Sequence, residues 1–241
     1  MRYTGFIKME IKGFIETSLI DWRGKIASLI FTGGCNFRCP FCHNRELVLE
    51  PDSIETIDHE YVLVSLQNRK KWLDGVVITG GEPTLRHGLE NFINKIKELG
   101  LCVKLDTNGT MPDVLKKLFD KKLVDYVALD IKTALDNERY SHAAGTSVSV
   151  DKICETIALL VDYNIDHEFR TTLVPGIIDK DDIISIFNKI KDTAKKWVWQ
   201  DFRPVGTLDE SFTQIEPYSK EIVNKYKELI NNSSILICTG Q

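Results

Sequence analysis

Residues 26–42 read Ile26-Ala-Ser-Leu-Ile-Phe-Thr32-Gly33-Gly34-Cys35-Asn-Phe-Arg-Cys39-Pro-Phe-Cys42, an apolar run that leads through two glycines into three cysteines. The run up to Thr32 is rich in β-branched and aromatic residues, which predicts a buried strand. A second apolar run, Gly75 to Thr79, leads directly into Gly80-Gly81-Glu82-Pro83. Strands that end at such turns indicate an α/β fold, in which functional groups follow the carboxyl ends of parallel strands.

The rest of the chain repeats this alternation of short apolar runs and longer segments with a 3.6-residue period, as expected for a parallel sheet covered by crossover helices. The predicted strands are 26–32, 75–79, 101–106, 125–131, 166–174 and 197–203, and the predicted helices are 58–72, 86–99, 111–122, 149–163 and 180–195. These make six βα units. Six units are too few to close an eight-stranded barrel.

Length and composition set limits on the class of protein. The chain has 241 residues, of which 43% are hydrophobic, and this is enough to bury the core of one domain. We expect a single domain over 1–241, with a β extension at 1–24, a βα core at 25–205, and a closing helix and strand at 206–241. No apolar run approaches the ~20 residues of a membrane span, and the net charge of −4 argues against general nucleic-acid binding.

The six cysteines do not form the pattern of a disulfide framework, and we expect no signal peptide. The thiols should therefore stay reduced, as in a cytoplasmic enzyme. Cys102, Cys154 and Cys238 have apolar neighbours in the sequence, and we expect them in the core because a free cysteine behaves there as a small hydrophobe.

The other three cysteines have the spacing C-x3-C-x2-C, and three thiolates so spaced can hold a 4Fe–4S cluster with one iron left open. The alternatives are three unrelated core thiols, or a structural zinc site completed by His43 or a distant cysteine. Zinc sites tend to pair C-x2-4-C units. Since His43 directly follows Cys42, it is also poorly placed to bind the same ion. The spacing therefore favours the cluster.

Polar side chains follow several other predicted strands, at the end where α/β barrels build their active sites. Glycines 80 and 81 would let the backbone approach a ligand, and Glu82 could meet an ammonium group in a charge-assisted hydrogen bond. A lone carboxylate or lysine there often only caps a helix or forms an ion pair. Together, however, such groups could bind both ends of a zwitterionic cofactor. The candidates at the strand ends are Asp106, Asn108, Asp130, Lys132 and Arg170.

The three-cysteine loop followed by Gly80-Gly81-Glu82-Pro83 resembles the radical S-adenosylmethionine (SAM) superfamily, over residues 13 to 205. The resemblance implies a partial (β/α)6 TIM-like barrel and a 4Fe–4S cluster whose open iron is chelated by SAM. The residues that it implies as metal ligands are Cys35, Cys39 and Cys42. It implies that Phe41 lies against the adenine and that residues 80–83 line the methionine part. Asp106, Asn108, Asp130, Lys132 and Arg170 become candidates for the rest of the SAM site, with Arg170 facing the carboxylate as a planar fork.

The segment Cys42-His43-Asn44, with Ser18-Leu-Ile-Asp21-Trp-Arg-Gly24 before it, is similar more narrowly to the activating proteins of anaerobic ribonucleoside-triphosphate reductase, and more broadly to pyruvate formate-lyase activase. This likeness implies reductive cleavage of SAM to methionine and a 5′-deoxyadenosyl radical. The radical would take a hydrogen atom from a backbone glycine of a partner glycyl radical enzyme. A flavodoxin or a ferredoxin is implied as electron donor. His43 would lie in the surroundings of the cluster.

Two other functions stay open from the sequence. One is a small-molecule radical SAM enzyme, such as one forming a deazaguanine precursor, which would need further specific groups in the barrel. The other is a zinc-stabilised binding module without catalysis. The pair Trp22-Arg23 also departs from the Tyr-Pro expected in close relatives, which leaves the contact with a partner in doubt.

Overall fold

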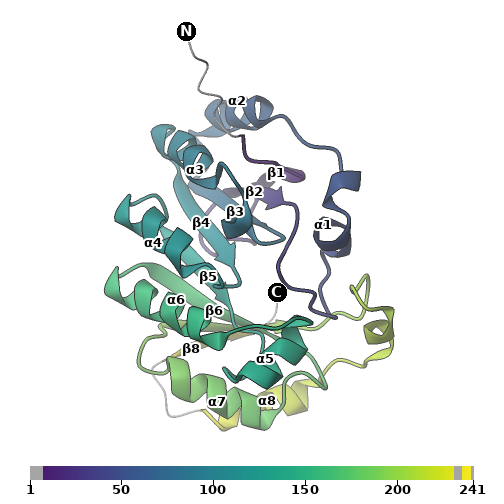
Figure 1. Ribbon diagram of the computed structural model, residues 1–241. Helices are drawn as coiled ribbons and strands as arrows, with labels where there is room; N and C mark the ends of the chain where they lie inside the picture. Colours follow the sequence, from purple (N-terminus) through teal and green to yellow (C-terminus); the bar gives the residue numbers. More distant parts are fainter. Residues whose placement is uncertain (1–7, 231–234, 240–241) are drawn as a thin grey trace. The chain divides into compact units, whose positions relative to one another are not determined.

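The computed structural model describes residues 8–230 and 235–239 (Figure 1). The chain is divided into two compact units. Unit 1 contains the residues up to Cys35 together with Glu46–Thr107 and Asp113–Val127. Unit 2 contains Asn36–Arg45, Asn108–Pro112 and the chain from Ala128 onward. Neighbouring strands of the sheet follow chain order, from β1 to β8.

Unit 1 is built on the first four strands. They are β1 (Gly13–Ser18), β2 (Ala27–Thr32), β3 (Gly75–Gly80) and β4 (Cys102–Thr107). Strand β1 pairs antiparallel with β2, whereas β2 with β3 and β3 with β4 are parallel. The helices are α1 (Arg45–Leu49), which begins at the last residue of a unit 2 segment, α2 (His59–Arg69), α3 (Leu89–Glu98) and α4 (Pro112–Asp120), with short 3-10 helices at Pro51–Ser53 and Pro83–Leu85.

Unit 2 carries the later strands. Strand β5 (Tyr126–Asp130) begins in unit 1 and ends in unit 2, and it is followed by β6 (Asp166–Leu173), β7 (Lys196–Asp201) and β8 (Leu236–Thr239). Strand β7 is parallel to both β6 and β8. The helices are α5 (Asn137–Ala144), α6 (Val150–Asp162), α7 (Lys180–Ile190) and α8 (Lys220–Glu228), with a 3-10 helix at Glu210–Gln214.

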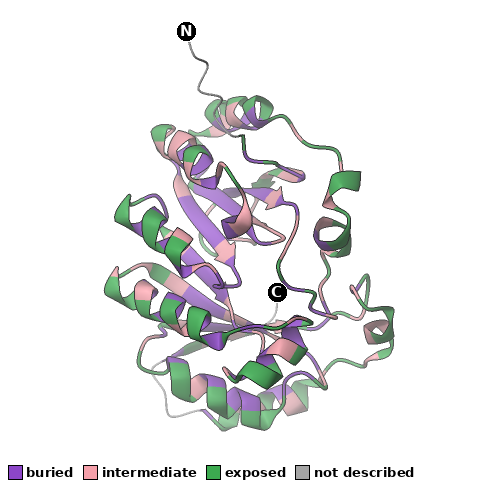
Figure 2. Cartoon of the chain, viewed as in Figure 1, coloured by how far each residue is buried: buried purple, intermediate pink, exposed green. Residues whose placement is uncertain are grey.

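The sequence explains the core of unit 1. Three consecutive residues of β3, Val76, Val77 and Ile78, are completely buried, as expected for a parallel strand covered on both faces. Helix α3 buries one face at helical spacing through Leu89, Phe92, Ile93 and Ile96. In Figure 2 the strands are mostly in the buried colour, whereas buried and exposed positions alternate along the helices.

The core of unit 2 contains two buried tryptophans on β7, Trp197 and Trp199, whose rings meet edge to face with centroids 5.3 Å apart. The indole N–H of Trp197 donates to Thr171 Oγ1 at 3.0 Å, which satisfies this polar group inside the core. Helix α7 begins with a capping box, in which the Asp179 side chain accepts from the Asp182 backbone N–H and the Asp182 side chain accepts from the Asp179 backbone N–H.

The predicted α/β alternation is present. Strands β2 to β7 match the six predicted strands to within two residues at most ends, with helices between them. Helix α3 begins three residues later than predicted because Gly88, at its N-cap, has a φ of +80°. Helix α5, in contrast, was absent from the predicted elements. Its composition gives a weak signal, because its buried positions include two alanines beside Tyr140.

Three further expectations from the sequence concern the domain division, the cysteines and membrane spans. The single domain over 1–241, with its divisions at 24 and 205, stays a prediction. None of the six cysteines is in a disulfide. Cys102, Cys154 and Cys238 are only half-buried, so the expectation that they lie in the core is met in part. In the described ranges, no helix combines the length and the apolar character that crossing a membrane would require.

Candidate active site

The glycines that follow β3 allow two backbone segments of unit 1 to touch. Gly80 has a φ of +113°, and a Cβ atom there would lie 2.5 Å from the backbone of Thr32. A Cβ on Gly81 would lie only 1.9 Å from the Gly34 carbonyl oxygen. The Gly81 N–H donates to Thr32 O and the Glu82 N–H to Gly34 O, both at 2.8 Å. These glycines therefore fix the 80–83 turn against the residues that lead into Cys35.

Glu82 is a buried carboxylate, with 1% of its surface exposed. Its Oε1 accepts from the Thr84 N–H at 3.0 Å, from Thr84 Oγ1 at 2.5 Å and from Thr107 Oγ1 at 2.8 Å. The side chain thereby caps the 3-10 helix that starts at Pro83, which is also buried. Burial and three donors hold this carboxylate in one place. Thr107, at the end of β4, is a site residue that the sequence analysis missed.

Asp106 lies in β4 among groups of unit 1, and its Oδ1 is 3.8 Å from Lys104 Nζ. Lys104 is itself buried and donates to the backbone carbonyl of Asp21 at 2.7 Å. Trp22, next to Asp21, is 5% exposed and packs against Tyr126 with ring centroids 5.8 Å apart. Trp22, which stands where a tyrosine was expected from close relatives, is thus a core residue. Lys104 holds the backbone next to it through Asp21.

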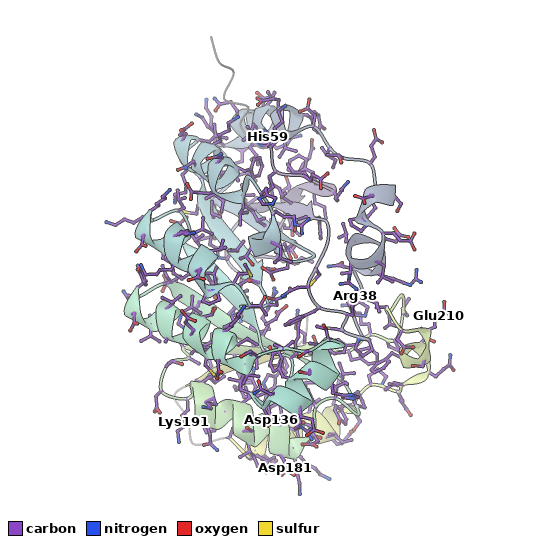
Figure 3. The ribbon with its side chains drawn as sticks, in the orientation of Figure 1. Arg38, His59, Asp136, Asp181, Lys191 and Glu210 are labelled. Atoms are coloured by element: carbon purple, nitrogen blue, oxygen red, sulfur yellow. The ribbon has the colours of Figure 1, made fainter. Side chains whose placement is uncertain are left out.

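The cysteine loop, residues 36–42, belongs to unit 2. Cys39 is buried and Cys42 half-buried, and the Cys42 N–H donates to Cys39 O at 3.0 Å, which closes a tight turn. Phe41, between them in this turn, is 5% exposed. Figure 3 labels Arg38 in the same loop.

A network of polar side chains holds the start of the cysteine loop. Asn108 Nδ2 donates to Asn36 Oδ1 at 2.8 Å, and Asn36 Nδ2 donates to Thr110 Oγ1 at 2.8 Å. Asn108 Oδ1 in turn accepts from the N–H and the hydroxyl of Thr110. Asn108 thus supports the start of the loop, and its expected contact with SAM stays a prediction. Asn36 and Thr110 were missed by sequence reasoning, because an isolated Asn or Thr in a loop carries no distinctive pattern.

His43 attaches the far end of this loop to the segment after β7. Its Nε2 lies 2.7 Å from the Arg203 carbonyl oxygen, so Nε2 is the donor in this contact. The ring also stacks on Phe202, with centroids 6.5 Å apart and planes at 15°. The Asp209 N–H donates to Pro40 O at 2.9 Å and adds a second tie.

Three of the candidate residues meet in unit 2, in what we name the Asp130 cluster: Asp130, Lys132 and Arg170. Asp130 Oδ1 accepts from Arg170 Nε at 2.8 Å, and its Oδ2 accepts from Lys132 Nζ at 3.0 Å. The Ile131 N–H donates to Arg170 O at 2.8 Å, which brings β6 beside the end of β5. The cluster is largely buried, with 15% to 23% of each side chain exposed.

The charged groups of this cluster shift one another's pKa values strongly. Burial alone would raise the pKa of Asp130, but the attraction of Arg170 and Lys132 and the hydrogen bonds from both outweigh it and lower this pKa to about 2. Burial alone would lower the pKa of Lys132, but the attraction of Asp130 and then of Cys39 raises it. Two cations therefore lie beside one carboxylate in this cluster. Guanidinium and ammonium groups can bind an anionic group such as a carboxylate.

The structure thus gathers the predicted residues in two sets, one in each unit. Residues 80–83 and Asp106 are in unit 1, whereas Phe41, Asn108 and the Asp130 cluster are in unit 2. The proposed ligands are divided as well, with Cys35 in unit 1 and Cys39 and Cys42 in unit 2. Their roles stay predictions.

The chemistry of the donor set fits the group that the spacing predicts. None of the three thiols is in a disulfide, and Lys132 provides a positive charge whose field acts on Cys39. Within the described part of the chain, no three His, Cys, Asp or Glu side chains are arranged to hold a single metal ion. The assignment of the cluster ligands therefore depends on the C-x3-C-x2-C spacing.

Comparison with known proteins gives a family and several relatives. Residues 29–188 match the model of the radical SAM superfamily. A Methanocaldococcus jannaschii protein, provisionally named a glycyl-radical enzyme activating enzyme, is 35% identical over 227 residues, covering 92% of this chain and 91% of that protein. The pyruvate formate-lyase-activating enzyme of Staphylococcus aureus is 30% identical over 216 residues, covering 83% of this chain and 78% of that enzyme.

Solved structures show the same fold at low sequence identity. Streptococcus suis SuiB bound to S-adenosylmethionine has a TM-score of 0.65 at 16% identity over 88% of this chain, and this chain spans 50% of SuiB. The protein anSMEcpe with bound AdoMet has a TM-score of 0.59 at 20% identity, covering 86% of this chain and 61% of that one. Together with the six βα units, these likenesses confirm the predicted fold class.

The family match spans β2 to α7 and includes the three-cysteine loop, the turn at residues 80–83 and the Asp130 cluster. It implies a 4Fe–4S cluster and SAM as cofactors, in agreement with three cysteines that form no disulfide and with the two cations beside Asp130. The chain is an enzyme that belongs to the radical SAM superfamily.

Proposed function

We propose that this chain is a glycyl radical enzyme activase, which removes a hydrogen atom from a backbone glycine of a partner protein. The observation that carries the proposal is the match over nine-tenths of both chains to a relative named as a glycyl-radical enzyme activating enzyme. A second relative, named for pyruvate formate-lyase activation, supports the same class of partner. The finer proposal is that the partner is anaerobic ribonucleoside-triphosphate reductase, which rests on Cys42-His43-Asn44.

In this proposal the chain's own residues bind and orient. The 4Fe–4S cluster and SAM, when bound, supply one-electron reductive chemistry that yields a strong hydrogen-atom abstractor. Arg170 and Lys132 would bind the carboxylate of SAM, and Asp130 would hold both cations in position. Glu82 would accept from the ammonium group, with Thr84 and Thr107 keeping its side chain fixed.

The proposed substrate is a glycine in a loop of the partner protein. Glycine is the residue whose Cα hydrogen can be presented by a loop without a side chain in the way. A flavodoxin or a ferredoxin would deliver the electron.

The test is to incubate the anaerobically reconstituted and reduced protein with SAM and purified candidate glycyl radical enzymes. We expect an electron paramagnetic resonance doublet from a glycyl radical with anaerobic ribonucleoside-triphosphate reductase. A doublet with another glycyl radical enzyme would retain the class and replace the partner. Turnover of a small metabolite without any doublet would instead support the small-molecule enzyme, and stoichiometric zinc without SAM cleavage would support the binding module.

A further inference from the structure

Helix α5 contains a buried tyrosine, Tyr140, whose hydroxyl contacts the backbone of the Asp130 cluster. Tyr140 is completely buried, and its hydroxyl donates to the Asp130 carbonyl oxygen and accepts from the Lys132 N–H, both at 3.2 Å. Burial is the largest influence on the pKa of Tyr140 and raises it, so the phenol stays protonated and can make both bonds. One hydroxyl group therefore joins the backbone on both sides of Ile131.

The ring of the same tyrosine contacts the cysteine loop. Phe37, two residues before Cys39, meets the Tyr140 ring at a centroid distance of 6.3 Å and an angle of 66°. Both aromatic side chains are buried, with Phe37 at 3% exposure. Tyr140 is thus in contact with the cysteine loop through its ring and with the Asp130 cluster through its hydroxyl.

The end of α5 makes a second contact with the loop. The Arg38 N–H donates to the Ala144 carbonyl oxygen at 2.7 Å, which satisfies one of the unpaired carbonyls at the helix end. Gly145 then ends the helix with a φ of +63°. A Cβ atom on Gly145 would lie 2.2 Å from the Arg38 carbonyl oxygen, so a larger residue would displace the loop.

From these contacts we propose that α5 is a positioning element, in which Tyr140 and Gly145 set the cysteine loop relative to the Asp130 cluster. This proposal rests on the proposed function, because the cysteine loop and the Asp130 cluster are the two parts that would hold the 4Fe–4S cluster and SAM. Tyr140 reaches neither cofactor in this role. It acts through the backbone of residues 130–132 and through Phe37, so its effect is on alignment, and misalignment of reacting groups by 1 Å can lower a rate about 100-fold.

The test uses Tyr140→Phe, which keeps the ring against Phe37 and removes only the hydroxyl. The matched control is Tyr218→Phe, because the Tyr218 hydroxyl also donates to a backbone carbonyl within unit 2, that of Ile178 at 2.6 Å. In the full-length apo-protein we expect hydrogen exchange at the amides of residues 36–42 to become at least about tenfold faster in Tyr140→Phe, and unchanged in Tyr218→Phe.

The reconstituted proteins give the second readout. We expect Tyr140→Phe to bind as much iron as the wild type, to cleave SAM under dithionite with kcat lowered about tenfold and KM for SAM changed less than threefold, and to alter the paramagnetic resonance signal that SAM addition produces. Gly145→Ala should shift the same signal, because its Cβ presses on Arg38.

The outcomes separate this proposal from the proposed function. Wild-type exchange rates at residues 36–42 in Tyr140→Phe would overturn the positioning role, whether or not the protein cleaves SAM. Equal acceleration in both tyrosine variants would also overturn it, since it would show general loosening. A wild-type protein that binds no cluster would overturn the proposed function, while exchange in the apo-protein still decides the role of α5.

Discussion

Asp130 is a single residue that acts on two others, because its carboxylate faces both Arg170 and Lys132. Its pKa is lowered from the ordinary value of 3.8 to about 2. A group whose pKa is lowered by folding stabilises the fold above its unfolded pKa and loses this contribution as the pH falls toward its folded pKa. The contribution should therefore be complete at pH 7 and disappear between about pH 4 and pH 2.

Asp130→Asn tests this directly. We expect the apo-protein to lose about 2 kcal/mol of unfolding free energy at pH 7, because both cations lose the carboxylate that they face in a mostly buried site. The variant should also lack the corresponding loss between about pH 4 and pH 2, so the two stability curves converge in acid. Urea unfolding at a series of pH values measures both effects. Asp192→Asn, at an exposed position, is the control, and parallel curves for Asp130→Asn and the wild type would contradict the coupling.

Among the elements, the 80–83 turn depends on its glycines for a contact that the sequence did not predict. Sequence reasoning expected the glycines to let the backbone approach a ligand, and this stays a prediction. The structure shows that they let the backbone of Thr32 and Gly34 approach. A strand followed by Gly-Gly-Glu-Pro indicates a functional turn. It does not indicate which segment will lie against it, because that depends on the pairing of β2 with β3.

Gly81→Ala should destabilise the protein by about 3 kcal/mol, because its Cβ would overlap a backbone oxygen that cannot rotate away. The matched control is Gly100→Ala. Gly100 has a φ of +83°, but no atom lies within 4 Å of the place that a Cβ would take, so this change should cost only the backbone strain of about 1 kcal/mol. Thermal unfolding compares the two. A Gly81→Ala variant as stable as Gly100→Ala would mean that the turn can move away from Gly34.

The strands were predictable from sequence and the supports of the site were not. Apolar runs such as Val76 to Ile78 fix a buried strand because every residue contributes to the signal. Tyr140, Asn36 and Thr107 act through contacts with residues far away in the chain, which are Phe37, Asn108 and Glu82, and no local spacing reveals them. Arg170 could be named as a candidate, but its pairing with Asp130 required the register of β5 and β6.

For the whole molecule, the property to test is the 4Fe–4S cluster that the family match implies, which we predict is bound through three cysteines. Cys39→Ala should abolish binding, because it removes a buried thiolate from the proposed set. Cys154→Ala, a half-buried position in α6, should only perturb packing and leave about four iron and four sulfide per chain. Anaerobic reconstitution followed by iron and sulfide analysis distinguishes them. Equal iron content in the two variants would contradict the assignment of Cys39.

The division into two units also has a consequence at the level of the gene. The polypeptide passes from one unit to the other after residues 35, 45, 107, 112 and 127, so each unit is assembled from separate stretches of the chain. No single cut in the reading frame would release either unit as a continuous fragment. A cut after residue 127 would keep unit 1 whole, but it would separate residues 36–45 and 108–112 from the rest of unit 2. Expressing the two halves apart, or exchanging one half with that of a relative, would therefore break unit 2 at that point.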